Sequence, residues 1–270
     1  MKIAYAVAPA DITGAFMGLQ GPLYEALETV ARIGYEGVEL FVRDPATLDV
    51  VQLKQALQEH RLTIPVIGTT HVLKQDGLSL LSPDREIRRQ TVARLCRIVR
   101  LAAQLGSDIS LGKVRGSREG LSELQWQEYL GEGLSALSTE ARKDVHILVE
   151  AQHASNIDNL NGIAETLRFL RGLSLSPVKI HIDTYHVNLT EQDPVAAIES
   201  CRGMLGYLHC ADSGRMIPSE GTIDLKRMFQ ACRNIGYDGW VGLEISQGSD
   251  PLATARRAFV ALKHVIESSV

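Results

Sequence analysis

The sequence predicts an α/β protein with a single (β/α)8 barrel, the TIM-barrel fold, and three observations support this. Short runs rich in Val and Ile recur at regular intervals along the 270 residues, and each is followed by a longer stretch with helical periodicity. Eight such strand–helix pairs can be counted. The segment "ARIGYEGVEL" near the start is echoed by "CRNIGYDGWVGLEI" near the end, so one helix–glycine–strand unit is used twice. Strict alternation of this kind indicates parallel strands closed into a barrel.

The predicted strands are short apolar runs of the length that buried parallel strands have. In order they are KIAYAV (2–7), GVELF (37–41), TIPVIGTT (63–70), DISLGKV (108–114), VHILVEAQ (145–152), VKIHIDTYH (178–186), LGYLHCAD (205–212) and GWVGLEIS (239–246). The clearest helical stretches between them show a 3.6-residue period and often end near a glycine. They span residues 23–37, 84–106, 159–173, 224–239 and 251–269.

A doubly wound open sheet is the rival architecture. Such sheets usually carry a glycine fingerprint after the first strand, and "VAPADITGAF" contains no GxGxxG. No Pro/Ser-rich linker or low-complexity tract interrupts the alternation. We therefore expect residues 1–270 to form one barrel domain.

Composition narrows the class of protein. A formal net charge of −4 and a pI near 6.1 give no excess of Lys and Arg, which argues against a nucleic-acid partner. No apolar run approaches the roughly 18 residues that span a bilayer, and the first residues are too short a hydrophobic stretch for a secretory signal. The four cysteines lack CxxC spacing, so reduced thiols are predicted. A cytoplasmic enzyme fits best, and apolar helix faces such as "AFVALKHVI" are compatible with core packing or with a homo-oligomer.

Polar side chains end most of the predicted strands. In a barrel of this kind the chemistry takes place at the carboxyl ends of the strands, where inward-pointing side chains converge. In "VKIHIDTYH" a period of two puts Ile180 and Ile182 towards the helices and His181 and Asp183 towards the barrel axis. The strand-end residues are Glu39, His71, Lys113, Glu150, Asp183, His186, His209 and Glu244.

Four of these residues predict a divalent metal site. Two glutamates, an aspartate and a histidine on successive strands supply oxygen and nitrogen ligands, a set that suits Mn²⁺, Mg²⁺ or Co²⁺ better than a thiolate zinc site does. Without a cation, burial and mutual repulsion would raise the pKa values of three carboxyl groups at one mouth. Taken singly, each acidic residue could instead cap a helix or pair with an arginine. The predicted ligands are Glu150, Asp183, His209 and Glu244, with Mn²⁺ as the expected ion and Mg²⁺, Co²⁺ or Zn²⁺ as alternatives.

The remaining candidates have weaker support. His71 either contacts substrate or simply closes the barrel mouth, and Glu39 is either a site residue or an ion-pair partner of Arg43. His181 lies one pleat deeper and is expected to be a hydrogen-bonded interior histidine. Lys113 opens the cluster "GKVRGSRE", which could bind a phosphate or carboxylate or could be a solvated loop.

The segments "ILVEAQ", "HIDTYHVNL", "LHCADSGRMIPSEG" and "GLEIS" resemble the xylose isomerase-like TIM barrels, in particular the sugar and sugar-phosphate isomerases and epimerases that include ketose 3-epimerases and hydroxypyruvate isomerases. The resemblance covers nearly the whole chain and is most specific in its second half. It implies that Glu150, Asp183, His209 and Glu244 bind the metal and that the two glutamates are the acid/base pair. It also implies that His186 and Arg215 hold substrate oxygens, and that the substrate is a small sugar or sugar phosphate.

The residue types fit such chemistry. Removing the proton beside a ketone leaves an enediolate, whose charge a divalent ion can stabilise by chelating two adjacent oxygens in the cis arrangement. If Glu150 and Glu244 lie on opposite faces of the reacting carbon, return of the proton from the second face inverts that centre. Return of the proton to the neighbouring carbon gives aldose–ketose isomerisation instead. Arg215 and His186 would stabilise the developing negative charge.

One departure leaves the substrate open. Ketose 3-epimerases generally have a glutamate six residues past the first metal ligand, where this sequence has Asn156. A metal-dependent dehydratase or lyase acting on a keto-polyol or keto-glycoside is therefore an alternative. A DNA repair enzyme resembling endonuclease IV is a more distant one. Its three-metal site needs a histidine after residues 108–114 and a DxH pair, where this chain has Asp224 and Lys226.

Overall fold

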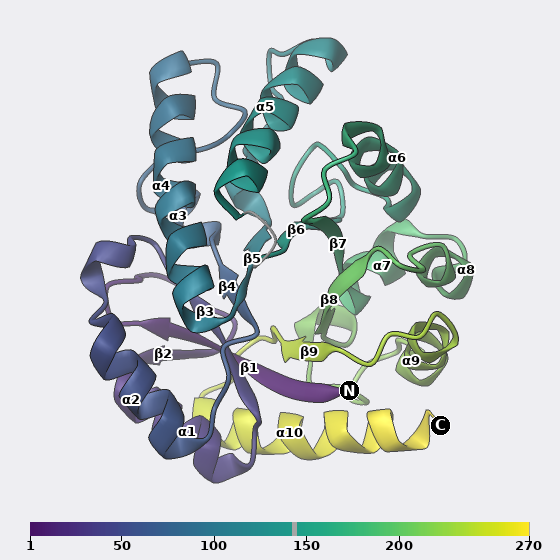
Figure 1. Ribbon diagram of the computed structural model, residues 1–270. Coiled ribbons are helices and arrows are strands. Elements are labelled where there is room, and N and C mark those ends of the chain that lie inside the picture. The colour runs from purple at the N-terminus through teal and green to yellow at the C-terminus, as the bar shows by residue number, and fades with distance from the viewer. Residues whose placement is uncertain (142–144, 270) are drawn as a thin grey trace.

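The computed structural model describes residues 1–141 and 145–269, and it confirms the predicted barrel. The strands pair in parallel in the order β1-β3-β4-β5-β6-β7-β8-β9, and β9 pairs back with β1 (Figure 1). Eight strands thus close on themselves, with helices outside them. The closing contact joins the two ends of the chain, with Lys2 opposite Trp240 and Tyr5 opposite Leu243.

Most barrel strands are shorter than predicted, because the polar residues after them enter helices or turns. Their bounds are β1 Lys2–Pro9, β3 Gly37–Phe41, β4 Val66–Gly68, β5 Asp108–Leu111, β6 Ile147–Glu150, β7 Val178–Asp183, β8 Leu205–Cys210 and β9 Trp240–Leu243. The expectation that one strand runs to His186 is wrong. The side chain of Asp183 accepts a hydrogen bond from the backbone N–H of Tyr185, which starts helix α7 (Thr184–Thr190) at the strand end.

A ninth strand, β2 (Leu19–Gly21), was not predicted. It pairs in parallel with the last residues of β1, Val7 to Pro9. Three residues are too few to show an alternating pattern, so the sequence gives no signal for this strand. The loop before β2 brings Met17 to the cavity at the barrel mouth.

The helices begin and end at residues that satisfy their free backbone groups. An aspartate side chain caps α2, α4, α8, α9 and α10, and Gly34 and Gly106 end α1 and α4 in the left-handed conformation. All five helices named from the sequence are present, with ends up to a few residues shorter. The long helices are α1 Leu23–Ile33, α2 Val50–His60, α4 Arg85–Leu105, α5 Glu123–Ala141, α6 Ile163–Leu173, α9 Leu225–Asn234 and α10 Pro251–Ser268. Short elements follow several strands: η1 Pro45–Thr47, α3 Thr70–Lys74, η2 Lys113–Arg115, α8 Pro194–Glu199 and η3 Ser213–Arg215.

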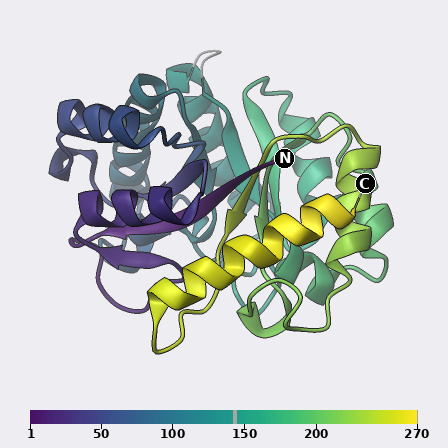
Figure 2. The same ribbon diagram turned by 90° about the horizontal axis from the view of Figure 1, so that it is seen from below.

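Helix α10 ties the last strand–helix unit to the first. Seen from below, it runs across the underside of the molecule next to α1 and β1 (Figure 2). The hydroxyl of Tyr35 donates to the carbonyl of Ala255 at 2.8 Å, and the rings of Tyr35 and Phe259 lie 4.9 Å apart. The barrel is therefore closed by helix packing as well as by strand pairing.

Alternation along the strands separates the two sides of the barrel wall. Ile180 and Ile182 belong to the large core between strands and helices, as predicted. Leu148 and Tyr207 form a separate buried cluster with Val66 on the other face. Since side chains two positions apart share a face, Leu148 and Tyr207 place the residues two positions later, at the strand ends, on that inner face.

Two further expectations concern the whole chain. All four cysteines are free, in agreement with the predicted reduced thiols. None of the helices in the described residues is long and apolar enough to cross a bilayer.

Candidate active site at the mouth of the barrel

Four of the predicted site residues converge at the carboxyl ends of neighbouring strands. Glu150 ends β6, Asp183 ends β7, His209 lies near the end of β8, and Glu244 directly follows β9. One ligand atom from each lies within 4.8 Å of the others. The Nδ1 atom of His209 is 3.7 Å from Glu150 Oε1, 3.7 Å from Asp183 Oδ2 and 3.8 Å from Glu244 Oε2. The four side chains thus face one point, as the metal hypothesis requires.

The donor atoms at this point fit a bound cation. Glu150 Oε1 and His209 Nδ1 are buried, and neither has a hydrogen-bond partner. Their opposite atoms are both engaged: Gln152 Nε2 donates to Glu150 Oε2, and His209 Nε2 donates to Glu39. A buried polar atom without a partner is costly, and a cation between these two atoms would remove that cost for both.

Glu39 lies against the metal-site histidine. Its carboxylate is 1% exposed, accepts from His209 Nε2 at 2.5 Å and accepts from the hydroxyl of Tyr207 at 3.3 Å. With its proton held on Nε2, His209 presents a lone pair on Nδ1 to the site. Arg43, the alternative partner considered from the sequence, pairs instead with Asp76 and Asp11. A direct contact of Glu39 with substrate stays a prediction.

Burial and nearby charges shift the pKa values of Glu150 and Glu244 in opposite directions. Burial raises the pKa of Glu244 to about 7; the negative charges of Glu150 and Asp183 add to this, while Arg215 and His209 oppose it. For Glu150, burial is outweighed by positive charge on His181 and His209, and its pKa lies well below the ordinary value. Two carboxyl groups with separated pKa values are what an acid/base pair requires.

His209 and Asp183 are shifted towards their charged forms. For His209, burial is outweighed by the charge of Glu39 and by the carboxylates around it, so its pKa is raised well above the ordinary value. For Asp183, burial is outweighed chiefly by the charge of Arg215, so its pKa is lowered. Because a metal ligand must give up its proton, binding of a cation here would release the proton from His209.

Arg215 and His186 reach the same point from the side. Arg215 Nη1 lies 2.5 Å from Asp183 Oδ2 and 3.1 Å from Glu244 Oε2, while Nη2 donates to His186 Nε2 at 3.0 Å. The guanidinium also lies 4.6 Å from the centre of the Tyr185 ring. His186 Nε2 is 3.8 Å from Glu150 Oε1. Both predicted substrate-binding residues are therefore beside the four converging side chains.

His71, Lys113 and His181 take different positions. His71 is buried in α3, its ring 5.9 Å from those of Phe16 and Phe41, and burial together with the charge of Lys74 lowers its pKa to about 4. Lys113 begins η2 and lines the mouth cavity. His181 is interior, as expected. Its Nδ1 atom is 2.8 Å from Ser110 Oγ, but its Nε2 atom has no partner.

The rest of the "GKVRGSRE" cluster does not face the mouth. Arg115 is fully buried and donates to the carbonyl of Leu111 and to the side chain of Asn159, so it joins two loops. Arg118 is held by Asp158 through its backbone and by Glu123 through its guanidinium. Of this cluster, only Lys113 lies at the cavity.

The converging residues open into a cavity of about 240 Å³. Its lining includes residues that the sequence did not single out. Gln152 lies two positions past Glu150, and Tyr185 lies between Asp183 and His186, so their spacing could have indicated them. Lys74 and Met17 lie in loops with no such spacing. The lining comprises Met17, Thr70, Lys74, Lys113, Gln152, His153, Asn156, Tyr185, His186, Arg215 and Glu244.

Gly112 leaves room for the Glu150 carboxylate. A Cβ atom at this position would lie 2.7 Å from Glu150 Oε2 and 3.0 Å from Gln152 Nε2. Both distances are too short for an ordinary contact, so a larger residue would displace this pair. The glycine between β5 and η2 therefore permits the geometry of the first metal ligand.

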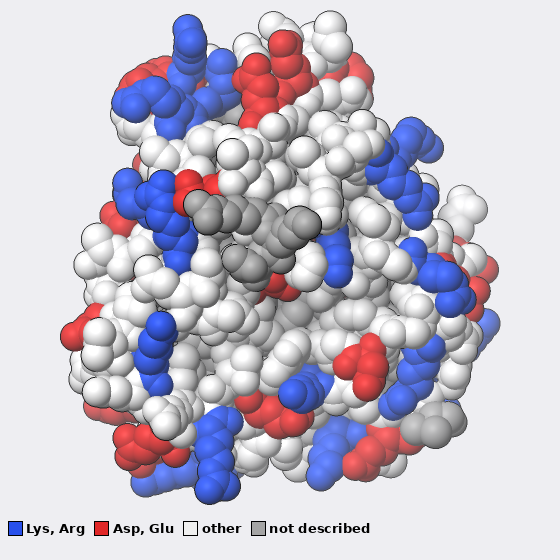
Figure 3. Space-filling view, viewed as in Figure 1, with Lys and Arg blue, Asp and Glu red and all other residues white. Residues whose placement is uncertain are grey.

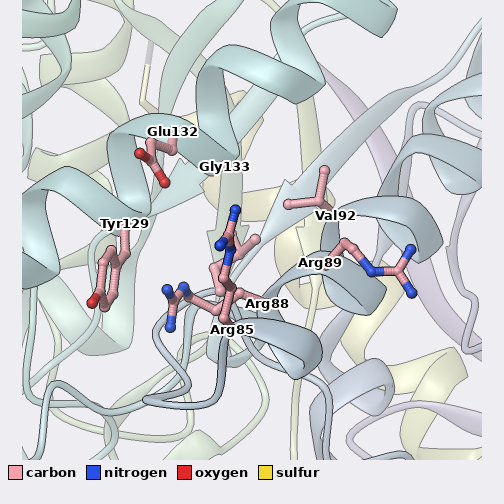
Figure 4. Close-up of a pocket in the computed structure, with 8 residues that line it drawn as sticks. Arg85, Arg88, Arg89, Val92, Tyr129, Glu132 and Gly133 are labelled. Carbon is pink, nitrogen blue, oxygen red and sulfur yellow. The ribbon is translucent and has the colours of Figure 1, made fainter.

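A second hollow lies on the outer helix layer, away from this mouth. It measures about 250 Å³ and is lined by residues of α4 and α5, among them Arg85 and Glu132 (Figure 4). Arg88 stacks over the Tyr129 ring at 3.7 Å, and Arg89 pairs with Glu86. Arg88 and Arg89 therefore already have partners on the outer surface, and neither lines the mouth cavity.

Comparisons with known proteins agree with the barrel fold. A family model described as xylose isomerase-like TIM barrel matches residues 27–264, which include all four converging side chains. A ketose 3-epimerase from Arthrobacter globiformis is 28% identical over 236 residues, which are 86% of this chain and 80% of that protein. A hydroxypyruvate isomerase from Escherichia coli K12 is 26% identical over 228 residues, 80% of this chain and 85% of that protein. A solved structure of D-psicose 3-epimerase with D-tagatose, from Clostridium cellulolyticum H10, matches with a TM-score of 0.82 at 20% identity and covers 98% of this chain and 99% of that one. The chain belongs to the xylose isomerase-like TIM barrel family.

Proposed function

We propose that this chain is a divalent-metal-dependent isomerase or epimerase of a ketose or sugar phosphate. The observation that supports it most is the meeting of Glu150, Asp183, His209 and Glu244 at one point, with two donor atoms left unpartnered. The curated relatives reported above are an epimerase and an isomerase of small molecules, which supports the same class of reaction. The chain is accordingly a sugar isomerase or epimerase. Its dependence on a metal and its proton-transfer mechanism are what we propose in addition.

The four ligands would hold the ion, and a divalent ion at this point supplies a Lewis acid that increases the acidity of the proton next to a substrate carbonyl. Gln152 fixes the Glu150 carboxylate through Oε2, and Glu39 fixes the His209 ring through Nε2. These two contacts orient the ligands before any substrate arrives.

In this proposal Glu150 and Glu244 exchange a proton with opposite faces of the substrate. Strand β6 and strand β9 are separated by β7 and β8 in the closed barrel, so the two carboxyl groups approach the mouth from different sides. One glutamate takes the proton and the other returns it.

Arg215 and His186 would stabilise the enediolate. Arg215 is held by Asp183 and Glu244, and one of its N–H groups contacts His186. Burial lowers the pKa of His186 to about 4, so the ring is neutral at pH 7 and can exchange hydrogen bonds with a substrate oxygen. Donors fixed before the reaction stabilise developing charge most effectively.

Two alternatives differ in how well the site supports them. A dehydratase or lyase would use the same residues and differ only in losing a β-oxygen, so product analysis separates it. The endonuclease reading lacks support: Asp224 caps α9, and the acidic ligand cluster found in the described residues has four members that face one point. On the face seen in Figure 3, basic and acidic side chains are interspersed, unlike a nucleic-acid surface.

Hydrogen exchange at carbon tests the proposal. Ketoses and their phosphates would be incubated with the protein in deuterated water with Mn²⁺, and deuterium in the recovered sugar measured by mass spectrometry. We expect deuterium on the carbon next to the keto group, loss of exchange with a chelator, and recovery with Mn²⁺ or Co²⁺. Full exchange in metal-free protein would overturn the metal dependence.

Replacement of the glutamates tests their role. Glu150→Gln and Glu244→Gln should each abolish turnover to the product sugar while circular dichroism stays unchanged, because each removes one of the two proton carriers. Glu25→Gln, an exposed change on α1, is the matched control and should keep full activity. A near-normal rate in either site variant would remove that residue from the acid/base pair.

Four further points belong to the proposal. Mn²⁺ is the expected ion, and the expected location is the cytoplasm. A single domain over residues 1–270 and assembly into a homo-oligomer also stay predictions. Size-exclusion chromatography with light scattering would measure the oligomeric state, and metal analysis of the purified protein would identify the ion.

A further inference from the structure

We propose that the substrate carries a terminal acidic group, a phosphate or a carboxylate, which binds between Lys74 and Lys113 at the barrel mouth. This inference rests on the proposed function, because it assumes that a keto-sugar reacts at the four converging side chains. It adds the charge of the substrate and the place where that charge binds.

The charges that line the mouth cavity do not balance. Arg215 is the third cation there, and it is already paired with Asp183 and Glu244. Within residues 1–141 and 145–269, neither Lys74 nor Lys113 forms an ion pair. A cation at the four ligands would further neutralise the carboxylates of the site. With an ion bound, the mouth therefore presents two ammonium groups that have no ion-pair partner among the described residues.

The fold places these two lysines on adjacent segments. Lys74 ends α3, which follows β4, and Lys113 begins η2, which follows the neighbouring strand β5. Helix α3 and η2 pack against each other. Partial burial and the positive charge of Lys74 lower the pKa of Lys113, while the charges of Glu244 and Glu150 act in the opposite direction. The two ammonium groups therefore repel each other. An acidic group between them would relieve this repulsion and gain charge-assisted hydrogen bonds.

The cavity has room for the rest of such a substrate. Another hollow, of about 270 Å³, adjoins the mouth cavity and shares Lys113 and Asn156 with it. Its other lining residues include Ser155 and Ser117, and the hydroxyl of Ser117 donates to Asp158. Lys113 thus lies between the mouth cavity, which would hold the reacting end of the sugar, and the adjoining hollow, which would hold its far end. The far end of the substrate, rather than its reacting carbon, is the part that these cations recognise.

The experiment compares substrates that differ only at the far end. Ketoses of four to six carbons would be tested as the neutral sugar, as the terminal phosphate and as the terminal carboxylic acid, with the Mn²⁺-loaded protein in deuterated water. We expect kcat/KM for at least one acidic form to exceed that of the neutral sugar by roughly 10- to 100-fold, the size of one or two hydrogen bonds to a charged group. The phosphate and carboxylate arms show which acid is preferred.

Variants connect the preference to the two lysines. Lys113→Met and Lys74→Met should each lower the ratio of acidic to neutral kcat/KM by about 10-fold or more, mainly through KM, and higher salt should reduce the preference of the unmodified protein. Lys263→Gln, an exposed change on α10, should leave the ratio unchanged.

The outcomes separate this inference from the proposed function. Exchange at equal rates with all three forms, or an acid preference that survives both lysine variants, overturns the inference and leaves the proposed function intact. Absence of exchange with every sugar overturns the proposed function and this inference with it.

Discussion

His209 uses its two ring nitrogens for different purposes. Nε2 donates to Glu39, while Nδ1 is buried and unpartnered among three carboxylates. Tyr207 adds a second contact to the Glu39 carboxylate, and a Cβ atom at Gly242 would meet both residues. Glu39 is therefore a positioning residue, since it acts on the metal site through His209.

Removing the charge of Glu39 should weaken metal binding. We expect Glu39→Gln to lower the affinity of the apo-protein for Mn²⁺ by roughly 10- to 100-fold, because the uncharged amide holds the imidazole less firmly. Isothermal titration of the chelator-treated protein measures this directly, without relying on activity. Glu36→Gln, three residues earlier and exposed, is the matched control. Unchanged affinity in Glu39→Gln would show that the contact is only structural.

His71 should make stability depend on pH. Its pKa is about 4 in the folded protein, because of burial and the charge of Lys74, against about 6.5 when unfolded. The unfolded chain therefore takes up a proton first as the pH falls, so the contribution of His71 is fully present above pH 6.5 and is lost as the pH falls from 6.5 towards 4. Between pH 7.5 and 5.0 this loss is about 2 kcal/mol.

Urea unfolding at these two pH values checks the His71 prediction. The free energy of unfolding should fall by about 2 kcal/mol less in His71→Gln than in the unmodified protein, since the variant has no proton to gain. His264→Gln, an exposed histidine of α10, serves as the control and should behave like the unmodified protein. An identical pH dependence in His71→Gln would contradict the prediction.

At the residue scale, the sequence indicated which residue types meet but not all of their contacts. Alternation within the strand was enough to put His181 and Asp183 on the inner face. It could not indicate that Glu39 and His209 touch, because residues 170 positions apart in the chain meet only once the barrel closes. Lys74 was missed for a related reason, since its place depends on α3, a five-residue helix without its own pattern.

At the scale of elements, the loops after the strands carry most of the site. The loop after β8 is organised by Asp212, which is fully buried and accepts from the backbone N–H groups of Ser213, Ser219 and Ile223. The same loop holds Arg215, whose carbonyl accepts from the N–H of Ser246 at 2.8 Å. One carboxylate thus fixes the segment that delivers Arg215 to the mouth.

Asp212→Asn should affect both stability and turnover. The amide would turn a donor towards at least one backbone N–H, which costs about 1–3 kcal/mol in unfolding free energy, and the loosened loop would lower kcat/KM by misplacing Arg215. Urea unfolding and the deuterium-exchange assay measure the two effects. Asp193→Asn replaces an exposed cap of α8 and should lower stability slightly with no effect on turnover. Equal behaviour of the two variants would argue against the role of Asp212.

The ends of the strands were the least predictable elements. The run "VKIHIDTYH" reads as continuous, yet the strand ends at Asp183 because that side chain caps the helix that follows. Local pattern does not distinguish a carboxylate that caps from one that binds a ligand, and Asp183 has an oxygen for each: Oδ1 accepts from Tyr185, while Oδ2 faces Arg215 and His209. The helices were easier, since their period and their end residues agree.

At the scale of the whole molecule, the closed barrel followed from repetition of one unit. Eight strand–helix pairs, with the same helix–glycine–strand phrase near both ends, left few architectures open, and the pairing of β1 with β9 confirms the closed form. Strand β2 lies outside this repetition and was not predicted. The closed barrel was thus predictable from the repeated pattern, and the extra strand β2 was not.

Because the candidate ligands come from four neighbouring strands, metal binding should stabilise the whole barrel. At a free Mn²⁺ concentration 100 times Kd the gain is about 2.7 kcal/mol, which corresponds to a rise in Tm of roughly 5–10 °C. Differential scanning calorimetry with chelator and with Mn²⁺ measures this, and Glu244→Gln should show a smaller rise. Equal Tm values with and without Mn²⁺ in the unmodified protein would count against a metal site.

The pairing of β1 with β9 also has a consequence for biosynthesis. On the ribosome, β1 is made before all the other barrel strands, and its closing partner β9, which begins at Trp240, is made after them. Until then the nascent chain exposes two unsatisfied sheet edges, one along β1 and one along the latest strand made, and such edges invite pairing with other chains. Closure therefore waits until β9 has been made, and only its pairing with β1 covers both edges.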